Sequence, residues 1–112
     1  ETRLPGTSLP LDDTAISHVL RYWGLGEALY DETPKLPLFT SGARDQHTAA
    51  FATPIFGSGD KFMAALTLSG AASRLEAART SGDVVAKQLQ AASDLSRKLG
   101  ASAALCERFY GV

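Results

Sequence analysis

The fold is decided by the stretch TAAFATPIFGSGDKFMAALTLS, residues 48–69. β-Branched, aromatic and small apolar side chains dominate residues 48–56 and 62–69, and the sequence GSGD at 57–60 between them is typical of a turn. The stretch therefore predicts a β-hairpin. Pro54 lacks an N–H group, which favours an edge position or a bulge. Residues 62–69 are apolar on both alternating faces, which favours a central strand covered on both sides.

Helical patterns lie on both sides of this hairpin. Apolar residues recur at helical spacing over residues 15–23, after N-cap candidates at residues 12–13, and predict a helix of about three turns. A second stripe over residues 84–99 predicts a longer helix. The side chains of residues 27–31 would alternate between two faces in a way that fits a short strand. Residues 32–46 contain prolines and a glycine, which are typical of a long loop. This order of elements predicts an α+β fold, an antiparallel β-sheet flanked by helices.

Composition and charge limit the kind of protein. With 112 residues, 45% of them hydrophobic and 21% charged, the chain has the composition of one soluble globular domain. The net charge is -1 and there is no basic run, which argues against direct binding to nucleic acid. No stretch has the length of a membrane-spanning helix, and no signal-peptide pattern is present. The single cysteine, Cys106, excludes an internal disulfide, so we expect a cytoplasmic protein without membrane contact.

A more specific motif runs through residues 52–75. It consists of ATPIF at 52–56, a glycine-containing turn, AALTLSG at 64–70 and SRL at 73–75. The motif resembles the C-terminal effector-binding domain of the IclR family of transcriptional regulators, which has a GAF-like fold. The resemblance is strongest from residue 50 to residue 76 and weaker before it.

Two further segments extend the resemblance. LSRKLG at 95–100 is similar to the end of the last helix of that family, and LPL at 9–11 is similar to the segment that opens its ligand-site helix. Asp12 and Asp13 depart from the family pattern, and the segment between Trp23 and Thr48 is shorter than usual.

The resemblance implies that residues 1–112 are a GAF-like effector-binding domain, partial or reduced at the N-terminus. It implies a small organic effector, either an organic acid or an aromatic compound, and no cofactor. The chain is expected to form a homodimer or homotetramer. Operator DNA would be bound only through a winged helix-turn-helix domain outside this sequence.

The same resemblance implies a set of ligand-binding residues. Thr67 and Ser69 match strand residues that face the effector pocket, and Ala50 matches a pocket residue of the preceding strand. The main chain at Ala15 and Ile16 matches a helix start that receives an anion. Physical chemistry agrees, because residues two apart in a strand point to one side and the N–H groups of a helix start favour an anion. The alternative is that both hydroxyls merely fill a crowded sheet face.

The remaining candidates are less specific. His47, at the base of the loop before the ligand strand, is a candidate to close over the pocket, and the alternative is an ordinary loop residue. For His18 an exposed helix position is favoured over ligand contact. The acidic residues Asp12 and Asp13 would repel a carboxylate, so a neutral or aromatic effector is equally expected. The wide spacing of both histidines and Cys106 argues against a metal site.

Other functions remain open at this point. A GAF sensory domain of a signalling protein would have the same fold, and a pure dimerisation module would use Trp23, Val85 and the residues Phe109 and Tyr110 as interface. Some GAF-fold proteins are thiol-dependent enzymes, but Cys106 is expected to lie outside the pocket. Since no nucleophile elbow, phosphate-binding loop or dinucleotide motif is present, we expect no enzymatic activity.

Overall fold

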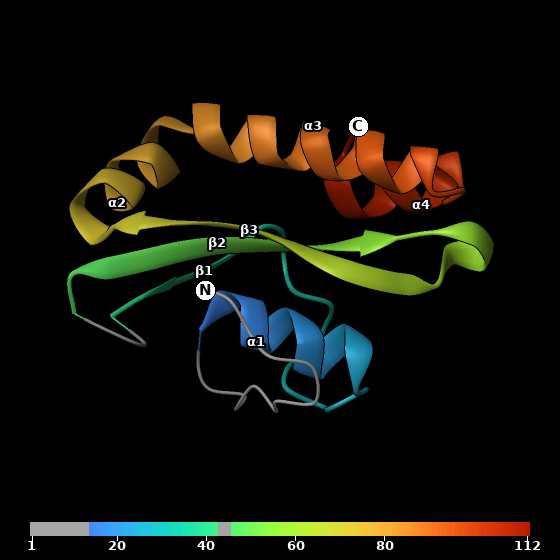
Figure 1. The fold of residues 1–112 in the computed structure, drawn as a ribbon, viewed down its shortest axis with the longest axis horizontal. Coiled ribbons are helices and arrows are strands. Elements are labelled where there is room, and N and C mark those ends of the chain that lie inside the picture. Colours follow the sequence, from blue (N-terminus) through green and yellow to red (C-terminus); the bar gives the residue numbers. More distant parts are fainter. Residues whose placement is uncertain (1–13, 43–45) are drawn as a thin grey trace, which may run out of the picture.

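The computed structural model describes residues 14–42 and 46–112. The helical elements are α1 (Ala15–Val19), its π-helical continuation η1 (Leu20–Gly24), the short turn η2 (Ser58–Asp60), α2 (Ala72–Ser81), α3 (Asp83–Lys98) and α4 (Ala103–Tyr110). The strands are β1 (Leu38–Ser41), β2 (Thr48–Phe56) and β3 (Phe62–Ala71), in the antiparallel order β1-β2-β3. The α+β fold expected from the sequence is confirmed. Helix α1 lies on one face of the sheet, and α2, α3 and α4 lie on the other (Figure 1).

The hairpin is present, but its second strand is an edge strand. Thr48 pairs with Ala71 and Ala52 pairs with Thr67, so β2 and β3 form the longest ladder of the sheet. The central strand is β2, and the prediction that residues 62–69 are central was wrong. Most residues of β3 are exposed or half-buried. An apolar run predicts burial on two faces only when its side chains are large, and β3 is rich in alanine, serine and glycine.

Pro54 occupies the position that its missing N–H group favours. Strand β1 pairs with β2 only as far as Ala52, so β2 has no strand on that side at Pro54, and the register shifts between Ile55 and Phe56. Of the two alternatives expected for Pro54, the edge position is confirmed, and the register shift lies one residue further along the strand. Side chains replace the missing strand, because the Tyr110 hydroxyl donates to the Pro54 carbonyl at 2.6 Å.

The predicted strand at residues 27–31 is absent. This segment instead folds back on the helix before it, since the Glu27 N–H donates to the Arg21 carbonyl and Arg21 pairs with the Glu27 carboxylate at 2.9 Å. The strand β1 lies inside the stretch that was expected to be a loop. The predicted N-cap residues at 12–13 and the LPL segment at 9–11 lie outside the described residues.

The long helical region divides at Gly82. The main chain of Gly82 has a φ of 82°, a left-handed conformation that ends α2 and precedes α3. Helix α3 begins at Asp83, directly before the apolar stripe at residues 84–99 that predicted it. Its buried side chains include Gln88, Ala92 and Ser96, which face the sheet.

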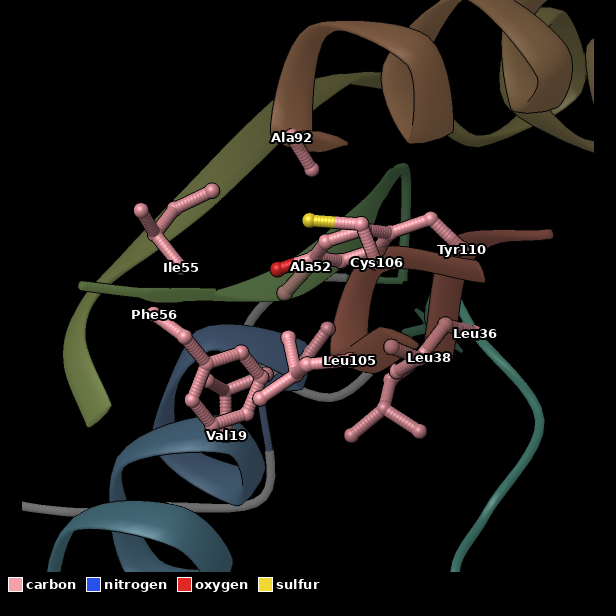
Figure 2. Packing of buried hydrophobic residues seen from close by; sticks show 11 residues of the cluster. Val19, Leu36, Leu38, Ala52, Ile55, Phe56, Ala92, Leu105, Cys106 and Tyr110 are labelled. Carbon is pink, nitrogen blue, oxygen red and sulfur yellow. The ribbon is translucent and has the colours of Figure 1, made fainter. Parts of the chain in front are cut away.

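The main core joins the sheet to α1 and α4. Val19 of α1, Phe56 of β2 and Leu105 of α4 belong to one buried cluster, and Figure 2 shows their side chains pointing toward one another. Cys106 and Tyr110 are buried in the same cluster, so the segment after residue 101 is a docked helix. A smaller cluster on the α3 side contains Ala49, Phe51 and Leu75.

Candidate functional site

One face of the sheet gathers most of the residues predicted to bind a ligand. Ala50 lies opposite Ser69 and Ala52 lies opposite Thr67, while on its other side Ala50 lies opposite Thr40. Side chains that are directly opposite in an antiparallel sheet point to the same face. We call the face that these five residues share the α1 face.

Helix α1 covers part of this face. The Ala15 N–H donates to the Thr40 hydroxyl at 2.9 Å, and the buried side chains of Ala15 and Val19 pack with Ala52. The start of α1 is therefore bonded to Thr40, which lies opposite Ala50 of β2, and the binding roles expected for Ala15, Ala50 and Ser69 stay predictions. Ile16 is half-buried on the helix.

The accessible part of the α1 face lies over β3. Thr67 and Ser69 are exposed and Ala50 is half-buried, whereas Ala15 is fully buried. The Thr67 hydroxyl donates to the Phe51 carbonyl at 3.1 Å. A hydroxyl that donates one bond still has lone pairs with which it can accept from a ligand. This part of the face thus presents two hydroxyls beside a small side chain.

The start of α1 differs from the expected anion site. The Ala15 N–H is already bonded to Thr40, so an anion at this position would compete with that hydroxyl. Helix α1 is also only five residues long, so its dipole is small. Thr40 was missed by the sequence analysis because it lies in a stretch that was predicted to be a loop. No residue type or spacing in that stretch indicates a bond to a residue 25 positions earlier.

The two histidines lie in different parts of the structure. His47 is exposed in the turn before β2, and its carbonyl accepts from the Ala72 N–H at 2.8 Å, so it lies at the sheet end where α2 begins. His18 is half-buried on α1, with Nδ1 at 3.0 Å from the Tyr30 hydroxyl. The role predicted for His47 stays a prediction, and His18 is part of the contact between α1 and the segment that follows it.

A hollow lies where the segment before β1 meets α3 and α4. This open groove, of about 690 Å³, is formed by residues 33–36, Leu89 of α3 and the end of α4. Lys35 and Arg108 contribute positive charge to it, and the Arg108 guanidinium lies 4.8 Å from the centre of the Phe109 ring. None of the ligand-binding residues predicted from the sequence lines this groove.

The thiol of Cys106 is enclosed in the core. Its exposed fraction is 0%, and the thiol lies 3.9 Å from the Ser93 carbonyl. A buried thiol in apolar surroundings is a structural group rather than a nucleophile. Within residues 14–42 and 46–112, no group of three or more His, Cys, Asp or Glu side chains is placed to hold a metal ion. In the same residues, no helix has both the length and the apolar character needed to cross a membrane.

Comparison of the chain with known protein families, with curated proteins and with solved structures found no match.

Proposed function

We propose that the chain is the effector-binding and oligomerisation part of a cytoplasmic transcriptional regulator similar to the IclR family, with a GAF-like fold. A small organic molecule binds on the α1 face, and a winged helix-turn-helix domain outside this sequence binds operator DNA. The observation that supports this proposal best is the arrangement of Thr67, Ser69 and Ala50. They come from different strands, yet they share one face beside α1.

The chemistry of this face favours a neutral polar or aromatic effector. Thr67 and Ser69 supply hydroxyls, which donate to or accept from a ligand, and neither supplies a charge. The Ala15 N–H that was expected to receive an anion is engaged by Thr40.

Ligand binding would act by a shift in population. An effector that binds one arrangement of the associated domains more tightly stabilises that arrangement by the difference in its two binding free energies. The spacing of the attached DNA-binding domains would change with it. A GAF sensory domain of a signalling protein is the alternative, and the output domain encoded beside this segment distinguishes the two.

The first prediction concerns ligand binding to the α1 face. A thermal-shift screen with neutral aromatic compounds and small organic acids is expected to find compounds that raise the melting temperature. At a ligand concentration about 100 times the dissociation constant, stabilisation is about 2.7 kcal/mol. Ser69→Ala and the double substitution Thr67→Val with Ser69→Ala should reduce this shift, because the ligand loses hydroxyl partners.

Matched controls remove hydroxyls elsewhere. Ser58→Ala changes the turn at the far end of the hairpin, and Thr80→Val removes a hydroxyl that donates to the Glu76 carbonyl on α2. Both controls should keep the ligand-induced shift of the unchanged protein. A compound that stabilises Ser69→Ala and the double variant as strongly as the unchanged protein would show that the site lies elsewhere.

A further inference from the structure

Among the described residues, 14–42 and 46–112, no strand pairs with the outer edge of β3. This strand spans ten residues, Phe62–Ala71, and within the described residues it pairs only with β2. In an antiparallel edge strand, alternate residues direct their N–H and C=O groups away from the sheet, where they can pair with another strand. The opposite edge strand, β1, has only four residues.

The free edge lacks charge and proline, two of the features that usually protect an edge strand. Its sequence, FMAALTLSGA, contains no charged residue and no proline. The nearest charged residues are Lys61 before it and Arg74 after it. Edge strands are normally protected by charges, proline, bulges or a covering segment. The register shift of this hairpin lies at its turn end, so most of β3 is regular.

Exposed apolar side chains line the same side of the molecule. Six large hydrophobic side chains are exposed in the described part of the chain; three of them belong to β3 and α3, and a fourth, Leu99, directly follows α3. Met63 is 56% exposed, and Leu68, Leu95 and Leu99 are each 41% exposed. A patch of this kind, rimmed by polar residues, is typical of an interaction surface.

Leu95 of α3 and Leu99 directly after it lie on the side of the helix that faces β3. Leu95 and Leu99 follow Gln88 by seven and eleven residues, which places all three on one stripe of the helix. The Gln88 amide donates to the Leu66 carbonyl of β3 at 3.2 Å, so this stripe faces β3. Near the hairpin turn, Gly57 lies between the Met63 side chain and the Leu99 carbonyl. The free edge and the apolar patch are therefore continuous.

We propose that β3 pairs antiparallel with β3 of a second copy of this chain, and that Met63, Leu68, Leu95 and Leu99 are buried around the twofold axis. The product is a continuous sheet of six strands, three from each copy. The proposal names the surface for the self-association included in the proposed function, and it does not depend on a ligand.

Two observations favour a second copy over another partner. Around a twofold axis residue i of one copy meets residue j of the other and j meets i, so the strand must be compatible with itself. A strand without charges meets this condition, whereas a charged peptide finds no complementary charge here. The lengths also match, because the ten residues of β3 in one copy would pair with the ten residues of β3 in the other. Pairing of β3 with β1 would match ten residues with four and would generate an open chain of copies.

The second prediction tests this surface by analytical ultracentrifugation of the whole chain over a wide range of concentration. The double substitution Ala64→Lys with Leu68→Lys introduces charges at exposed positions on the α3 side of β3. In the paired sheet these lysines face those of the other copy, so dimerisation should weaken by about tenfold or more. The control Ala104→Lys with Val112→Lys changes exposed residues on and after α4 and should leave the dimer unchanged.

Hydrogen exchange provides the second readout. The outward amides of β3 should be protected in the dimer and should exchange quickly in the lysine variant. A chain that remains monomeric, or a dimer that both lysine variants leave equally stable, contradicts the proposal. Protected β3 amides in a monomer also contradict it, because the edge would then be covered from within the same chain.

The two proposals can fail separately. Ala64 and Leu68 lie on the face opposite Thr67 and Ser69, because they pair with Ile55 and Phe51 on the α3 side. The lysine variant should therefore keep the ligand-induced thermal shift even when it is a monomer. Loss of association with a retained shift supports the dimer surface, whereas a missing shift in every variant argues only against the ligand site.

Discussion

Asp60 and Ser102 connect segments that are 42 residues apart. The Asp60 carboxylate accepts from the Ser102 N–H at 2.8 Å and from the Ser102 hydroxyl at 2.9 Å, and the same hydroxyl accepts from the Leu105 N–H at the start of α4. These bonds to the charged form hold the pKa of Asp60 below its usual value. One side chain in the hairpin turn thereby fixes the beginning of α4.

The third prediction is a pH-dependent effect of Asp60→Asn. Because the pKa of Asp60 is lower in the folded than in the unfolded protein, its contribution is present above pH about 4 and is lost as the pH falls through the folded value. Asp60→Asn should lower the melting temperature at neutral pH, and the difference from the unchanged protein should shrink in acid. Asparagine also tolerates the φ of 57° at this position.

A suitable control is Asp31→Asn, which changes an exposed aspartate outside the helices and strands. It should shift the melting temperature little at either pH. A difference between Asp60→Asn and the unchanged protein that stays constant from neutral to acidic pH would contradict the role of the carboxylate.

Tyr110 is the second residue whose hydroxyl joins distant segments. It donates to the Pro54 carbonyl and accepts from the Ser96 hydroxyl at 2.9 Å, and Ser96 in turn accepts from the Phe56 N–H at 3.1 Å. Burial raises the pKa of Tyr110. The network satisfies main-chain groups of β2 beyond the end of β1.

The fourth prediction is that Tyr110→Phe lowers the free energy of unfolding by about 1–3 kcal/mol, because buried polar partners lose a hydrogen bond. Denaturant unfolding measures this loss. Because the neutral phenol is favoured in the fold, the hydroxyl stabilises the protein below pH about 10 and this contribution is lost as the pH rises further. Tyr22→Phe is the control, and an equal loss in both variants would contradict the network.

At the scale of elements, α4 completes the edge of β2 that β1 leaves open. Leu105 is only 4% exposed and packs in the main core, and the Phe109 ring stacks on Phe56 with centres 5.2 Å apart. The sequence indicated neither contact, because the segment after residue 101 has no helical stripe long enough to predict docking. Its place is decided by an apolar surface on β2 that exists only once the sheet has formed.

The fifth prediction follows from this packing. Leu105→Ala should lower the free energy of unfolding by about 2–5 kcal/mol, the usual range for a buried leucine. Leu25→Ala, at a side chain that is 66% exposed, should change it by less than about 0.5 kcal/mol. Equal effects of the two substitutions in denaturant unfolding would show that α4 is not docked in solution.

At the scale of the whole molecule, the sheet separates two surfaces. The α1 face holds the exposed hydroxyls of Thr67 and Ser69, while the α3 side of β3 holds the apolar patch of Met63, Leu68, Leu95 and Leu99. Both surfaces end at the free edge of β3. Association through that edge would bring the α1 faces of the two copies side by side. The proposed ligand site and the proposed dimer surface would then be neighbours in one assembly.

The candidate site was predictable where it follows the period of a strand. Thr67 and Ser69 are two residues apart, so their shared face could be inferred before the fold was known. The pairing of Ala50 with Ser69 could not be inferred, because the irregularity between Ile55 and Phe56 shifts the register of the hairpin. The bond from Ala15 to Thr40 could not be inferred, since it joins two segments through tertiary structure alone.

The sequence by itself determined the local elements: the helix over residues 15–24, the hairpin with its turn at 57–60, and the start of α3 at Asp83. These depend on periodicity and turn chemistry, which act over a few residues. The tertiary structure alone decided that β2 is central, that residues 27–31 fold back on Arg21, and that α4 docks. These outcomes depend on which apolar surfaces meet, and surfaces far apart in sequence meet only in the folded chain.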